Sequence, residues 1–148
     1  MSSADHDLMK LYSQRILALA AEIPMTGRLA DADGSAMRRS PLCGSTVTVD
    51  VGIEDGRIAR FAQDVKACAL GQASASVLGK AVLGLDRAQI AAGREALAGL
   101  VKQDGPAPAA PFDALEALRP ARDYKNRHAS ILLAWDATLA AIDDALVN

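Results

Sequence analysis

The sequence has few of the features that mark several large classes of protein. Aromatic residues make up only 3% of its 148 residues, which argues against a base-stacking surface for nucleic acid. Lys+Arg 16 and Asp+Glu 18 leave a net charge of −2, so overall charge gives no reason to expect nucleic acid or an anionic membrane. No run approaches the roughly 20 apolar residues that span a bilayer. We therefore expect no nucleic-acid partner and no membrane partner.

Cysteine is also scarce, and the rest of the composition is typical of an ordinary folded chain. Two cysteines are too few for a disulfide framework, and residues 1–7 are polar, unlike a secretory leader. We expect a cytoplasmic protein with reduced thiols. A composition of 51% hydrophobic and 23% charged residues excludes a disordered tail. The length predicts a single domain over residues 1–148.

The clearest local pattern is a β-hairpin. Every odd-numbered residue over 47–53 is apolar and β-branched, which is the period of a half-buried strand. Asp55-Gly56 is typical of a tight turn that needs positive φ. Residues 57–65 are expected to form the return strand, with Ala59, Phe61 and Val65 on one face.

Helical patterns lie on both sides of this hairpin, and residues 27–42 are expected to form a loop that holds one edge strand. The expected helices cover residues 6–23, 68–84, 86–102, 112–118 and 127–146. This order predicts an α+β fold, with a small antiparallel sheet of about three strands and helices packed on one face.

Two cysteines flank the hairpin. Cys43 precedes the first strand, and Cys68 follows the return strand and opens a helix. Because a hairpin brings its strand ends together, we expect both thiols at one end of the sheet, within reach of one ligand. The helix N-terminus and Lys66 both favour a thiolate at Cys68, which makes it the more reactive thiol. The alternative is that both cysteines are small buried core residues.

Four segments carry a family signature. Residues 40–44 are similar to an Asn-Pro-x-Cys-Gly-Asp motif, and residues 68–76 resemble Cys-x-x-Ser-x-Ala-Ser-x-Ser. Residues 11–17 look like a first helix, and residues 127–135 look like a segment that holds a third cysteine. Together they resemble the U-type iron–sulfur cluster scaffold proteins of the NifU N-terminal, IscU and SufU type. The resemblance covers nearly the whole chain and is more SufU-like than IscU-like.

The chain departs from that family at two ligand positions. The family's Asp two residues after the first cysteine is Ser45, and its third cysteine falls on Ser130 or Ala129, depending on the register. The resemblance implies that the metal ligands are Cys43, Cys68 and His128. Ser45 and Ser130 are weak or substituted ligand positions. Taken alone, a histidine such as His128 is more often structural than a ligand.

The resemblance also implies a function. The expected protein is a scaffold or carrier and not an enzyme, and it binds iron or a transient iron–sulfur cluster. A cysteine desulfurase would supply sulfur, and apo iron–sulfur proteins would receive the cluster. Two subunits in a homodimer would complete the coordination by sharing a bridged cluster. Two alternatives stay open: a zinc-dependent, SufU-like sulfur acceptor, and a metal-free interaction homologue.

Overall fold

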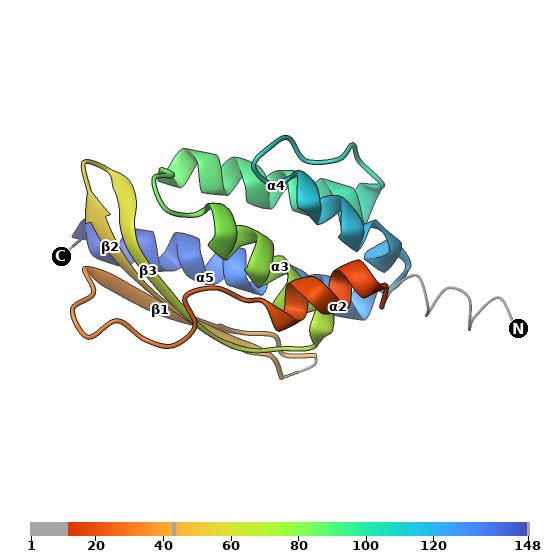
Figure 1. Ribbon diagram of the computed structural model, residues 1–148, viewed down its shortest axis with the longest axis horizontal. Helices are drawn as coiled ribbons and strands as arrows, with labels where there is room; N and C mark the ends of the chain where they lie inside the picture. Colours follow the sequence, from red (N-terminus) through yellow and green to blue (C-terminus); the bar gives the residue numbers. More distant parts are fainter. Residues whose placement is uncertain (1–11, 43, 148) are drawn as a thin grey trace, which may run out of the picture.

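The computed structural model describes residues 12–42 and 44–147, which form the α+β arrangement of Figure 1. Its elements are α2 (Gln14–Ala21), β1 (Gly34–Arg39), β2 (Thr46–Glu54), β3 (Arg57–Lys66), α3 (Ala69–Ala81), α4 (Arg87–Gln103), the 3-10 helices η1 (Asp113–Asp123) and η2 (Lys125–Arg127), and α5 (His128–Val147). The predicted fold class is confirmed. The part of the expected first helix before residue 12 lies outside the described residues.

The three strands form one sheet in the order β1-β2-β3, with both pairs antiparallel. Asp55 and Gly56 adopt φ values of 54° and 76°, as the predicted hairpin turn requires. A β-bulge at Gly52 shifts the register beyond it, so that Ile53 pairs with Ile58. The prediction that Ala59 shares a face with Phe61 is therefore wrong, because the bulge gives that position to Ile58, which is 2% exposed.

Two helices contact the sheet and two more lie behind them. α5 packs along β1 and β2, and α3 lies beside β3 and α5. α2 packs on α3, and α4 packs on α5 and η1, so the core lies between the sheet and these helices (Figure 1). α4 begins with the predicted capping box, in which Asp86 and Gln89 bond to each other's backbone N–H. Within the described residues, no helix is both long and apolar enough to cross a membrane.

A buried carboxylate ties the opposite face of the sheet together. The side chain of Asp50, on β2, is only 1% exposed. It accepts hydrogen bonds from Arg28 Nε at 2.6 Å, from the backbone N–H of Leu29 at 3.0 Å and from the Ser35 hydroxyl of β1. The Arg28 guanidinium, aided by the Ser35 and Leu29 donors, lowers the pKa of Asp50 to about 2 against the opposing effect of burial.

We expect Asp50→Asn to lower the free energy of unfolding by about 2 kcal/mol, because it removes a buried, paired charge. The loss depends on pH. In the unfolded chain the pKa of Asp50 returns to its ordinary value of 3.8. The contribution of Asp50 is therefore complete above that value and disappears as the pH falls through about 2. Urea denaturation of both proteins between pH 7 and pH 2 measures it.

Asp143→Asn is the matched control. Asp143 also forms a two-point pair, with Arg87, but these side chains are 54% and 45% exposed. Exposed pairs contribute little, so this variant should lose less than about 0.5 kcal/mol. Equal losses in the two variants, or an Asp50→Asn loss that does not shrink in acid, would contradict the interpretation.

Candidate functional site

Cys68 lies where β3 passes into α3. It is the N-cap residue of α3, and its side chain makes no capping hydrogen bond. Its carbonyl accepts the N–H of Gln72 at 2.9 Å, so the helix begins directly after it. The thiol is free and only half-buried. The predicted position at a helix N-terminus is confirmed, and Cys68 is partly exposed to solvent.

Two serine hydroxyls meet beside this thiol. Ser130 Oγ lies 3.7 Å from Cys68 Sγ and 3.1 Å from Ser45 Oγ. Both serines are buried, at 1% and 5% exposure. Ser45 comes from the segment before β2, and Ser130 from the first turn of α5. Three segments that are far apart in sequence therefore place a thiol and two hydroxyls together.

The structure distinguishes the two candidate registers at the start of α5. Ser130 points its hydroxyl at Cys68, whereas Ala129 is exposed and lines hollows on the surface. Successive helix residues point about 100° apart, so only one of the two can face the thiol. Ser130 is that residue.

Close packing of α3 on α5 sets this geometry. A Cβ added at Gly71 would lie 2.8 Å from Ser130 Oγ and 3.1 Å from the Ser130 carbonyl oxygen, so only glycine permits this approach. One turn further along α3, the Ser74 hydroxyl donates to the Ile131 carbonyl at 2.7 Å and accepts from Trp135 Nε1 at 3.0 Å. These contacts fix the end of α3 that carries Cys68 against the start of α5.

His128 is the first residue of α5 and is 7% exposed. Its Nε2 lies 2.9 Å from the carbonyl oxygen of Ala121, at the end of η1, and donates a hydrogen bond to it. In the neutral ring this bond leaves the Nδ1 lone pair unprotonated. The ring is thus anchored to η1, and the bond also joins η1 to α5.

Cys43 lies outside the described residues, so its position beside Cys68 stays a prediction. The residues around it form a closed loop. The Ser40 N–H donates to the Ser45 carbonyl at 2.8 Å, and the Gly44 N–H donates to the Ser40 carbonyl at 2.9 Å. Gly44 has φ +71°, a conformation that favours glycine.

The donor set is poor in strong metal ligands. Within residues 12–42 and 44–147, no group of three or more His, Cys, Asp or Glu side chains is placed to hold a metal ion. The described side chains at the site are one thiol and two hydroxyls, and hydroxyls are weaker ligands for soft metals than thiolates. The sequence found these three positions through the family motif. Gly71 and Ser74 also lie within the motif at residues 68–76, but the motif does not reveal that they set the approach of α3 to α5.

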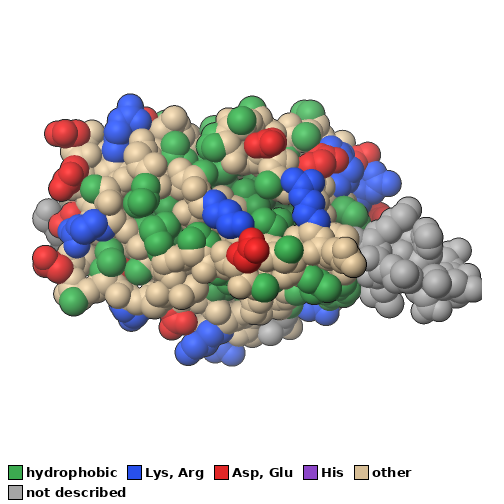
Figure 2. All heavy atoms as spheres, viewed as in Figure 1, with side chains coloured by type: hydrophobic (Ala, Val, Ile, Leu, Met, Phe, Trp, Pro, Cys, Tyr) green, Lys and Arg blue, Asp and Glu red, His purple; other side chains and the backbone are tan. Residues whose placement is uncertain are grey.

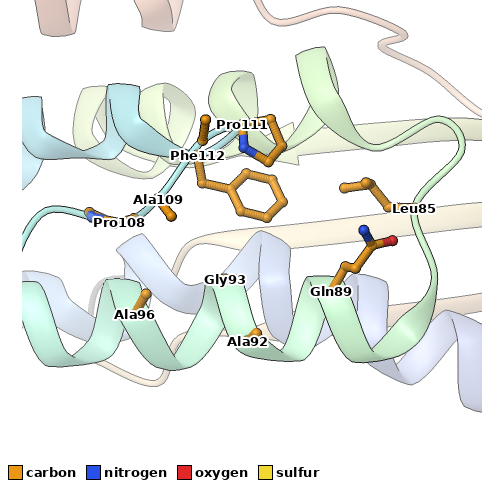
Figure 3. A pocket seen from close by; sticks show the side chains of 10 residues that line it. Leu85, Gln89, Ala92, Gly93, Ala96, Pro108, Ala109, Pro111 and Phe112 are labelled. Atoms are coloured by element: carbon orange, nitrogen blue, oxygen red, sulfur yellow. The ribbon is translucent and has the colours of Figure 1, made fainter.

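A separate apolar cavity of about 250 Å³ lies between α4 and residues 108–112 (Figure 3). The Phe112 ring lies over Gly93, where an added Cβ would be 2.7 Å from it. Leu85 lines this cavity and follows the C-terminal end of α3, whereas Cys68 precedes its N-terminal end. The cavity therefore does not belong to the thiol site.

We expect Gly71→Ala to lower the free energy of unfolding by about 1–2 kcal/mol, because the added methyl overpacks the contact with Ser130. Gly99→Ala is the matched control, since nothing lies within 4 Å of a Cβ added at this other helical glycine. The free energy of unfolding of that variant should rise by about 0.5–1 kcal/mol, because alanine has a higher helix propensity than glycine. Urea denaturation measures both changes, and stabilisation by Gly71→Ala would contradict the close approach.

The chain matches known proteins over nearly its full length. The NifU-like N terminal domain family matches residues 11–144. The crystal structure of a nitrogen-fixing NifU-like protein (N-terminal) from Brucella abortus is 42% identical, with a TM-score of 0.92 over 96% of this chain and 99% of that chain.

A second solved structure, of a putative iron–sulfur cluster assembly scaffold protein for the SUF system from thermophilic Fervidobacterium islandicum AW-1, shares the fold. It is 17% identical, with a TM-score of 0.81 over 90% of this chain and 98% of that chain. The search of curated proteins found no match. On the family match and the fold, this chain belongs to the NifU-like N-terminal domain family.

Proposed function

We propose that the protein is a scaffold or carrier that holds iron or a transient iron–sulfur cluster during cluster assembly. Membership of the NifU-like family supports this function. The observation that carries it is the half-buried Cys68 thiol, with the Ser130 and Ser45 hydroxyls beside it where three segments meet. A cluster that must be handed on needs thiolate ligands that remain accessible. Binding and transfer, with no catalysed reaction, are the proposed activity.

We propose Cys43, Cys68 and His128 as the ligands of one metal centre. The bond from His128 Nε2 to Ala121 supports this role, because it favours the tautomer whose Nδ1 can bind a metal. Ser45 and Ser130 would contribute hydroxyls where the family has a carboxylate and a thiolate. Such a set binds less tightly than four strong ligands, which suits a cargo that is passed on. A homodimer would supply a bridged cluster with two thiolates from each chain.

A second candidate is a zinc-dependent sulfur acceptor, which the accessible free thiol of Cys68 favours. Its thiolate would attack the outer sulfur of a persulfide on a cysteine desulfurase. A new sulfur–sulfur bond forms on Cys68 while the donor's sulfur–sulfur bond breaks, and the donor cysteine leaves as a thiolate. No external oxidant or reductant is needed for this step.

Variants at and around the Cys68 thiol test the metal centre. After anaerobic reconstitution, we expect Cys68→Ser to retain no iron or acid-labile sulfide. Ser130→Cys should retain iron at least tenfold longer against a chelator, because it adds a thiolate beside Cys68. Ser45→Asp should act in the same direction by adding a carboxylate. Ala129→Cys is the control, since it adds a thiol on the exposed side of the helix and should change nothing.

Two results would overturn this site. If Cys68→Ser and His128→Ala both leave the metal content unchanged, the ligand assignment is wrong and Cys68 has only a structural role. If Ala129→Cys increases retention as much as Ser130→Cys, the position of Ser130 at the thiol plays no part in binding.

The proposed partner is the cysteine desulfurase of the same organism, with apo iron–sulfur proteins as later recipients. We expect isothermal titration calorimetry to detect a complex with the desulfurase. Zinc-loaded protein that accepts persulfide sulfur at Cys68, detected by mass spectrometry, would favour the second candidate. No complex with or without metal would remove the main support for the assembly function. A metal-free interaction homologue would be indicated instead by protein that contains no metal and no sulfide.

A further inference from the structure

Two neighbouring hollows lie beside the start of α5. One, of about 260 Å³, includes Arg38 and Arg39 in its lining. The other, of about 410 Å³, includes Lys125. Lys102 and Ala129 line both hollows, so the two adjoin each other at the start of α5. This surface is assembled from the end of β1, the last turn of α4, η2 and the first turn of α5.

Positive charge is concentrated there. Arg94 and Arg122 also line the hollows, but they are paired with Asp136 and Asp104. The four remaining cations are exposed, and none forms an ion pair within the part of the chain that the structure describes. They are Arg38, Arg39, Lys102 and Lys125, which we call the basic surface.

The chain as a whole has a net charge of −2, so this concentration is local. The face that carries α2 is different, because acidic and basic side chains alternate on it (Figure 2). Four unneutralised cations on one side produce a positive potential that attracts carboxylates over roughly a Debye length of 8–10 Å.

The basic surface adjoins the thiol. Ala129 lines both hollows, and the next residue, Ser130, contacts Cys68 Sγ. On the sheet, Arg39 pairs with Thr46 and Thr46 pairs with Lys66, two residues before Cys68. Adjacent strands are about 4.8 Å apart, so Arg39 lies about 10 Å from Lys66 across the end of the sheet. A molecule that covers the basic surface therefore lies against residues that adjoin those around the thiol. Ser40, for example, lines the first hollow, and its backbone N–H donates to the carbonyl of Ser45.

We propose that the basic surface docks a carboxylate-rich segment of the protein that delivers sulfur to Cys68. The identity of this partner rests on the proposed function, whereas the carboxylate chemistry rests on the four cations. Electrostatic docking beside the thiol speeds the encounter and orients the donor without requiring a tight, permanent complex. This fits a carrier that must also release its partner and meet a recipient.

Nucleic acid is the other polyanion that such a surface attracts. Among the described residues that line the two hollows, the imidazole of His128 is the one aromatic ring. Nucleic acid is disfavoured because this ring is only 7% exposed and is bonded to Ala121, which leaves little ring face on which a base could stack. An acidic protein segment needs no such ring, so the observations favour carboxylates.

The test uses a fluorescein-labelled 12-residue peptide of alternating Glu and Gly, titrated with the full chain at 20 mM salt. We expect Lys102→Gln/Lys125→Gln to weaken binding about tenfold. The control, Arg57→Gln/Lys80→Gln, removes the same charge from exposed residues at the hairpin turn and at the far end of α3. It should stay within about twofold of the wild type. With 15N-labelled protein, peptide-induced shifts should centre on Ala129.

Equal weakening in the two double variants, or no peptide binding to the wild type, would overturn the proposal. So would a single-stranded 12-nucleotide DNA that binds more tightly than the peptide. The same variants with the desulfurase should show an association rate about tenfold lower only for Lys102→Gln/Lys125→Gln.

Failure of the docking surface can be distinguished from failure of the proposed function. Cys68→Ser should lose metal and keep peptide binding, whereas Lys102→Gln/Lys125→Gln should keep metal and lose peptide binding. If the wild type retains metal but does not bind the peptide, the docking surface is wrong. If it binds the peptide but retains no metal, the proposed function is wrong.

Discussion

The contact between α3 and α5 is the constraint on which the site depends. Gly71 lets the two helices approach until a Cβ would meet Ser130, and Ser74 then bonds to both the Ile131 carbonyl and the Trp135 indole. A hydroxyl buried at 0% exposure between two partners cannot give up either without a cost of about 1–3 kcal/mol. The rigid contact places the N-terminus of α3, with Cys68, beside the N-terminus of α5. The hairpin adds Ser45 from the third side.

This arrangement gives a centre that is poor in thiolates, and its surroundings fit that character. Hydroxyls at Ser45 and Ser130 leave Cys68 as the strong ligand among the described residues at the site. Weak retention is a disadvantage for a resident cofactor but an advantage for cargo. The basic surface beside the site fits the same use, because charge steering produces fast association with modest affinity. Under the proposed function, both features serve the handover of a cluster more than its storage.

Much of the fold could be predicted from the sequence, because its local signals agree with the structure. Strand alternation, the Asp55-Gly56 turn and the capping box at Asp86 each act over a few residues, and each was found where expected. Ala59 was misplaced because a bulge leaves no trace in an alternating pattern. Asp50 has the same limitation, since a polar residue on the outward row of a strand looks solvated until the segment that covers it is known.

The site could be predicted only in part, for a related reason. The motif located Cys68 and the two substituted positions, but the choice between Ser130 and Ala129 depends on how α5 is rotated against α3.

The most direct test of the account is the metal and acid-labile sulfide content of the wild-type protein purified without exposure to air. The account predicts iron together with acid-labile sulfide, absent from Cys68→Ser prepared in the same way. Protein that contains neither iron, zinc nor sulfide, even after reconstitution, would contradict it.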